Sequence, residues 1–177
     1  MSQPPGFAAP IDALLAVATC LGDFTIMNES CETELEPRFF IGDAGGGGVL
    51  DCCTGGRPVL RVEATGELPA SGAPFVLGKH GCVEMVMGIT VTFLSCFKTI
   101  SKSGTVITDP AELGYGRVLQ DARWRAVKAL RCCGPANIRY VSAIPVPSDG
   151  KCSGFQIDLL ANLTLCAPCP TPVAVSG

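Results

Sequence analysis

The sequence predicts an α+β fold in which a mainly antiparallel sheet carries two helices packed on one face. Residues 82–97 alternate apolar and polar side chains, which indicates a long strand with one buried face. Residues 110–133 repeat apolar side chains at intervals of three and four, which indicates an amphipathic helix. The other strand-like segments come in neighbouring pairs joined by short turns, which favours antiparallel pairing. We expect residues 1–177 to form one domain with flexible Pro- and Gly-rich ends.

The first helix is predicted over residues 11–21. Pro10 suits its first turn, and Gly22 is a natural stop. The helical spacing places the following apolar residues on one face: Ile11, Leu14, Leu15, Ala18 and Leu21.

The segment that follows is predicted to contain short strands and loops. Residues 38–41 indicate a short strand, and residues 49–64 indicate two short strands or one strand broken at Gly55-Gly56. Residues 65–81 are rich in Pro and Gly and are expected to form a loop. In the second half of residues 49–64 one face is apolar: Leu60, Val62 and Ala64.

The strand over residues 82–97 is expected to be the central strand of the sheet. Sixteen residues would span roughly 50 Å, whereas a usual strand spans roughly 20 Å. Either Gly88 bends this strand, or part of it leaves the domain to meet a partner. Its apolar face comprises Val83, Met85, Met87, Ile89, Val91 and Phe93.

The second helix is expected to begin at Asp109-Pro110 and to end at Gly134-Pro135. Two strands follow it, over residues 138–146 and 155–166. The helix has an apolar stripe: Tyr115, Val118, Leu119, Ala122, Ala126, Ala129, Leu130 and Cys133.

The composition indicates a subunit of an assembly. Hydrophobic residues make up 47% of the chain and charged residues only 16%, which is little charge to cover a free surface. No apolar run approaches the roughly 18 uncharged residues of a membrane span. The net charge is −3, and Lys and Arg are not clustered into a patch, so direct, tight nucleic-acid binding is not expected. Because the first basic residue is Arg38, we interpret the N-terminus as that of a mature, cytosolically made protein.

The eleven cysteines are expected to be mostly reduced and to act as small buried hydrophobes. Cys166-Ala-Pro-Cys169 could exchange disulfides, but Pro170 prevents the following helix that would lower a thiol pKa. A zinc site using Cys166, Cys169 and two distant cysteines stays open. The adjacent pairs Cys52-Cys53 and Cys132-Cys133 do not suit one ion, because paired zinc ligands usually have two or more residues between them.

No other pattern indicates catalysis or cofactor binding. The glycines at 45–48 lack the Lys-Ser or Lys-Thr and the helix start of a phosphate-binding loop, and indicate a flexible connector. His80 is the one histidine and lies in a Gly-rich stretch without a partner pattern for a nucleophile. Glu32, Glu34 and Glu36 are interpreted as an exposed acidic stretch. We therefore predict no catalytic, cofactor-binding or metal-binding residues, and not an enzyme.

Three segments together resemble a known family: IDALLAVATCL, VLDCCTGGRPVLRV and SAIPVPSDGKCSGFQIDL. The pattern is similar to the tail terminator, or head-to-tail connector, proteins of long-tailed phages that infect actinobacteria. In that family an Asp-Cys precedes a Gly-containing turn and a strand, and a Gly/Cys-rich turn precedes the last strand. Asp51-Cys52 and residues 150–154 match those places. Cys53 and the Cys166-to-Cys169 segment depart from the pattern.

The resemblance implies a structural virion protein, assembled in the host cytoplasm and located in the tail or neck. Its subunits would form a ring, expected to be a hexamer, that caps the tail tube protein and joins it to the head connector or stopper protein. DNA would pass through the ring without specific binding, and no membrane or cofactor is involved. We expect the sheet edge and the loop at 45–48 to meet neighbouring subunits. The alternatives are another neck or minor tail subunit or, in a different class, a cysteine-rich zinc-binding or redox protein.

Overall fold

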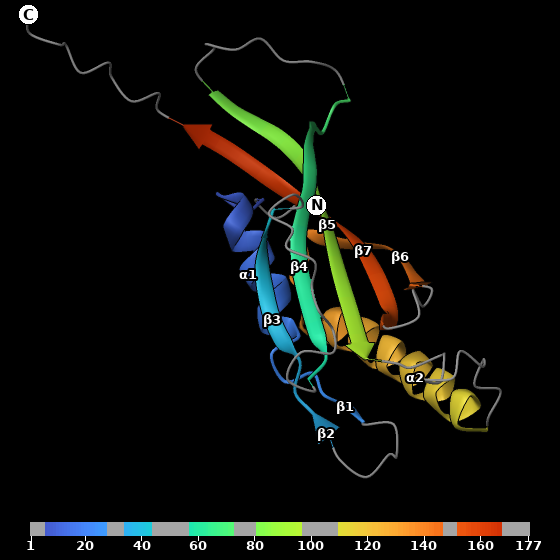
Figure 1. The fold of residues 1–177 in the computed structure, drawn as a ribbon. Helices are drawn as coiled ribbons and strands as arrows, with labels where there is room; N and C mark the ends of the chain where they lie inside the picture. The colour runs from blue at the N-terminus through green and yellow to red at the C-terminus, as the bar shows by residue number, and fades with distance from the viewer. Residues whose placement is uncertain are drawn as a thin grey trace, which may run out of the picture.

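The computed structural model describes residues 6–27, 34–43, 57–72, 81–96, 110–146 and 152–167. These residues form two helices, a five-stranded sheet and a two-stranded sheet (Figure 1). In chain order the elements are α1 (Pro10–Cys20), β1 (Ile26–Met27), β2 (Glu34–Leu35), β3 (Arg38–Asp43), β4 (Val59–Pro69), β5 (Gly81–Cys96), α2 (Pro110–Cys133), β6 (Ile138–Val146) and β7 (Cys152–Ala167).

The main sheet has the strand order β3-β4-β5-β7-β6, so the long strand β5 is central, as predicted. The pairs β4–β5, β5–β7 and β6–β7 are antiparallel, and only β3–β4 is parallel among the described strands. The short strands β1 and β2 form a separate antiparallel pair. The fold is therefore α+β with a mainly antiparallel sheet, which confirms the predicted class.

The hydrophobic core lies between one face of the sheet and the two helices. Alternate residues of β5 point into it, as the period-two pattern predicted, and α2 contributes Val118, Ala122 and Ala126. The rings of Phe93 and Phe155 stack with their centroids 4.9 Å apart. Burial of such apolar side chains supplies the main stabilisation of the fold. The largest fully buried side chains are Phe93, Phe155, Leu21, Leu60, Met87, Ile89, Ile157, Leu163, Val17, Val59, Val62 and Val91.

The buried face of α1 differs from the predicted one. Leu14 and Leu21 are buried, but Ile11 and Leu15 are exposed, and Ala13 and Val17 take their place in the core. The helix is apolar on most sides, so its spacing alone did not select one face. The small side chain of Ala13, one turn before Val17, suits close packing on the sheet.

β4 continues to Pro69, so the loop predicted from residue 65 onward is wrong for residues 65–69. The β4–β5 register shifts between Ala64 and Gly66, where Gly66 adopts a φ of 137°. A Cβ on Gly88 would meet the Thr65 hydroxyl at this irregularity. Such a bulge increases the local twist, and β5 curves along its length (Figure 1). The register shift lies opposite Gly88, the residue at which a bend was one of the two explanations for the length of this strand.

One end of the sheet extends past the helices. The register places residues 68–69, 81–84 and 164–167 at this end, which we call the projecting end. Phe7 covers part of the outer edge of β7 beyond β6: its N–H donates to Asn162 O at 3.0 Å, and its carbonyl accepts from Thr164 N at 2.9 Å.

Candidate functional site

Among the described residues, no group of three or more His, Cys, Asp or Glu side chains could hold a metal ion. Glu34 and Glu36 are exposed. Other residues weighed in the sequence lie outside the described part of the chain: Glu32, Gly45–Gly48, Cys52, Cys53, His80 and Cys169. The candidate sites considered below are surfaces of the described part of the chain.

Most of the described cysteines are disulfide-bonded, so the expectation of reduced, buried thiols is wrong for them. Disulfide bonds join Cys20 to Cys133 and Cys82 to Cys166. Cys96 and Cys152, which are register partners at the other end of the β5–β7 ladder, are each disulfide-bonded too. Cys132 is a free, exposed thiol. In the sheet, the register brings Cys82 opposite Cys166 although 84 residues separate them, and no local pattern reveals such a pairing.

The Cys82–Cys166 bond also bears on the Cys-x-x-Cys segment. Metal ligation and thiol exchange both require a thiolate. The sulfur of Cys166 is bonded to Cys82, so in this structure Cys166 supplies no thiolate to either reaction.

Exposed apolar side chains gather on the two edge strands of the sheet, β3 and β6. These strands lie at opposite ends of the strand order, and neither has a second strand partner among the described residues. An exposed apolar edge can pair with another chain. The residues and their exposed fractions are Phe40 (41%), Ile41 (39%), Tyr140 (55%), Val141 (53%) and Ile144 (47%).

The sequence predicted both edge strands but did not reveal that they are edges. Residues 38–41 and 138–146 have the apolar residues of a half-buried strand. The same pattern would fit an inner strand, whose neighbours on both sides would cover these side chains. Strand order depends on pairings between distant segments. Only the strand order of the folded sheet therefore identifies β3 and β6 as edge strands.

Polar side chains form a hydrogen-bonded group on the sheet face opposite the helices. Asp158 on β7 accepts hydrogen bonds from Ser142 Oγ at 2.8 Å, Gln156 Nε2 at 2.7 Å and Thr90 Oγ1 at 3.2 Å. These bonds join β5, β7 and β6 across this face. They satisfy the carboxylate and favour a single arrangement of the three strands.

Glu63 lies on the same face and forms an ion pair with Arg61. Burial raises the pKa of the Glu63 carboxyl, and the nearby Arg61 charge partly opposes that rise. The Glu63 side chain is largely withdrawn from solvent, which disfavours its charged form. We interpret the pair as structural.

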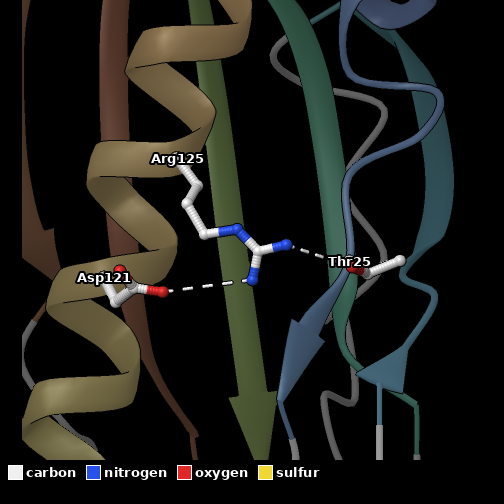
Figure 2. A network of polar contacts seen from close by, with 3 residues as sticks. All are labelled: Thr25, Asp121 and Arg125. Atoms are coloured by element: carbon white, nitrogen blue, oxygen red, sulfur yellow. Dashed lines mark hydrogen bonds and ion pairs between the residues drawn. The ribbon is translucent and has the colours of Figure 1, made fainter.

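The outer face of α2 is basic and carries an exposed tryptophan. Four exposed residues follow one line along this helix: Arg117, Trp124, Lys128 and Arg131. Arg125 lies to the side, donating to Thr25 Oγ1 at 3.4 Å and lying 3.9 Å from Asp121 (Figure 2). The expectation that Lys and Arg are not clustered into a patch is therefore wrong for this face of α2, because the helix brings Arg117, Lys128 and Arg131 to one side.

An apolar cavity of about 450 Å³ lies between the C-terminal ends of the two helices and β6. It adjoins the Cys20–Cys133 bond, and the β6 residue Tyr140 forms part of its wall. Its other lining residues are mostly apolar, and Arg131 is the one charged residue among them.

No model of a known protein family matches the chain, and no curated protein matches it either. Of the helices in the described residues, none is both long and apolar enough to cross a membrane.

Proposed function

We propose that this chain is a structural protein of a phage virion, a tail terminator whose subunits form a ring on the tail tube and join it to the head connector. The observation that supports this most directly is the pair of apolar sheet edges. Phe40 and Ile144 are exposed on opposite edges of one sheet, so each subunit offers two different surfaces for self-association. Two different surfaces that meet head to tail generate a ring when the rotation closes.

The projecting end gives the proposed ring a second contact. Its β5 and β7 strands are joined by the Cys82–Cys166 bond, and Leu68 on β4 is the most exposed large apolar residue among those described. A rigid, apolar end beyond the helices suits docking on the tail tube or on the connector. Low overall charge is also consistent with a subunit that buries surface in an assembly.

DNA would pass through this ring without specific binding. The net charge of −3 disfavours a tight grip on phosphates. In this proposal the basic face of α2, with Lys128 and Arg131, is turned away from the DNA path.

Electron microscopy of tail tubes mixed with the purified chain tests the proposal. We expect density of one ring at one end of each tube, and a tube treated in this way should no longer lengthen when free tube protein is added. Leu68→Asp should weaken the binding to tubes if the projecting end makes the contact. Binding along the tube wall would indicate another tail subunit, and no binding to tubes at all would contradict the proposal.

Metal analysis of the purified chain distinguishes the proposed structural protein from the alternative, a cysteine-rich zinc-binding protein. A zinc-binding protein would contain one equivalent of zinc per chain and would lose folded structure when a chelator removes it. The proposed structural role predicts no stoichiometric zinc and no change on chelation.

A further inference from the structure

The two edge strands lie at the same level of the sheet. The registers can be followed strand by strand from β3 to β6, and each such line of residues forms one row across the sheet. Phe40 pairs with Arg61, Arg61 with Thr92, Thr92 with Gln156, and Gln156 with Ile144. The same steps put Arg38 in the row of Val146, Ile41 in the row of Ala143, and Asp43 in the row of Tyr140.

The edge strands also run in opposite directions. β3 is parallel to β4, and β5 is antiparallel to both β4 and β7, so β3, β4 and β7 share one direction. β6 is antiparallel to β7 and therefore opposite to β3. If a second copy is placed beside β6 in the same orientation, its β3 meets β6 antiparallel, which is the more stable way for two strands to pair.

The free backbone groups of the two edges match in this arrangement. Arg38 N–H donates to Pro58 O at 2.8 Å, so the backbone N–H and C=O groups of residues 38, 40 and 42 point towards β4. The backbone groups of Ile41 therefore point away from the sheet. Asn162 N–H donates to Asn137 O at 2.9 Å, so on β7 the alternate residues 160, 158 and 156 turn towards β6. The backbone groups of Ile144, the register partner of Gln156, therefore point towards β7. Those of its neighbour Ala143 point away from the sheet. Ile41 and Ala143 thus offer their N–H and C=O groups outward in the same row.

The exposed side chains match as well. Phe40 and Ile144 share a row, and their side chains lie on the face opposite the helices. The backbone N–H and C=O groups of both residues point into their own sheet. In an antiparallel pair, such a position brings the two side chains closest together. Neither β3 nor β6 contains a lysine, the usual protection of an edge. The features of β6 that protect an edge are the exposed Arg139, the register shift between Tyr140 and Ser142, and Pro145, which lacks an N–H.

We propose that copies of this chain associate head to tail through β3 of one copy and β6 of the next, so that their sheets become continuous. Ile41 of one copy would exchange hydrogen bonds with Ala143 of the next, and Phe40 would pack on Ile144. The partner is a second copy of this chain. This inference deepens the proposed ring by naming its subunit contact, and it concerns self-association only.

Two single variants and their mixture test the head-to-tail contact. Phe40→Asp removes the β3 surface and leaves β6 intact, while Ile144→Asp does the reverse. We expect each variant alone to be monomeric by light scattering, because a charge would be buried at the joint. Their mixture should give a one-to-one dimer and nothing larger, since only one intact edge of each kind is available.

A charge-pair rescue tests whether residue 40 of one copy lies opposite residue 144 of the next. Phe40→Glu and Ile144→Lys should each prevent association, and the double variant should regain it, more strongly at low salt, because the two charges would face one another. Leu15→Asp is the matched control: it adds a charge to an apolar position on α1 that is 47% exposed, as Ile144 is, and that lies on neither edge strand, so it should leave the native mass unchanged.

Several results would overturn the contact. If the wild-type chain stays monomeric even after tail tubes are added, or if both aspartate variants still associate, the edges do not join copies. If only one variant is monomeric, the contact is symmetric through that edge alone. All variants are expected to fold because the altered positions are exposed, and circular dichroism checks this. A ring that forms on tail tubes despite both substitutions would preserve the proposed function while refuting this interface.

Discussion

Cys82 and Cys166 lie directly opposite one another at the projecting end of the sheet, and a disulfide bond joins them. At the other end of the same ladder, Cys96 and Cys152 are also opposite one another, and each is disulfide-bonded. The β5–β7 strand pair is thus covalently joined at its projecting end. A covalent restraint of this kind suits a subunit that extends its sheet beyond the helices that cover it.

Removing the Cys20–Cys133 bond should destabilise the chain. The bond joins the C-terminal ends of the two helices across 113 residues, and a cross-link of this kind restricts the unfolded chain. The double variant Cys20→Ser/Cys133→Ser should lose about 2–4 kcal/mol of unfolding free energy in urea titrations under oxidising conditions. Cys132→Ser is the control, because its thiol is free and exposed, and its stability should equal that of the wild type.

Gly154 should not tolerate a side chain. A Cβ at this position would meet the carbonyl oxygen of Phe93 on the neighbouring strand, and that backbone atom cannot turn aside. Gly154→Ala should therefore cost about 3 kcal/mol of unfolding free energy. Gly42→Ala, in open space on β3, should be neutral or slightly stabilising. Equal stability of the two variants would contradict the close approach of β5 and β7.

Glu63→Gln should change how stability depends on pH. Because burial raises the pKa of Glu63 above its ordinary value of 4.5, the folded state holds this proton more tightly than the unfolded state. The stability from that proton is complete below pH 4.5 and is lost as the pH rises through the folded pKa. The glutamine variant lacks this loss, so its stability relative to the wild type should increase from acidic to neutral pH. A constant difference across that range would contradict the raised pKa.

The outer face of α2 should not contribute to DNA binding if it is turned away from the DNA path. Each phosphate contact contributes about 0.9 to the slope of log affinity against log salt concentration. We therefore expect Lys128→Glu/Arg131→Glu to leave the weak affinity for duplex DNA and its salt slope unchanged. A slope lower by about 2 would show that both cations contact phosphates.

The sequence predicted the elements well where one segment carried its own pattern. The alternation around Met87, Ile89 and Val91 predicted the central strand and its buried face, and the spacing around Ala122 predicted α2. Where a pattern was ambiguous, the prediction failed: α1 is apolar on most sides, so Ile11 was placed in the core although it is exposed. Gly66 and Pro69 resemble loop residues, yet the long partner β5 keeps them in a strand.

The features that matter most for the candidate surfaces depend on distant segments. The pairing of Cys82 with Cys166 follows from the β5–β7 register, and the parallel β3–β4 pair follows from a connection with no local signal. The exposure of Phe40 and Ile144 requires knowing that their strands are edges. Cysteine counting and strand patterns cannot supply this information, because it depends on which strands become neighbours.

The native mass of the purified chain, measured alone and after addition of tail tubes, tests the proposed ring most directly. We expect a closed oligomer, or a monomer that becomes one when tubes are added. A stable monomer that ignores tubes would contradict the ring, and stoichiometric zinc in that monomer would favour the metal-binding class.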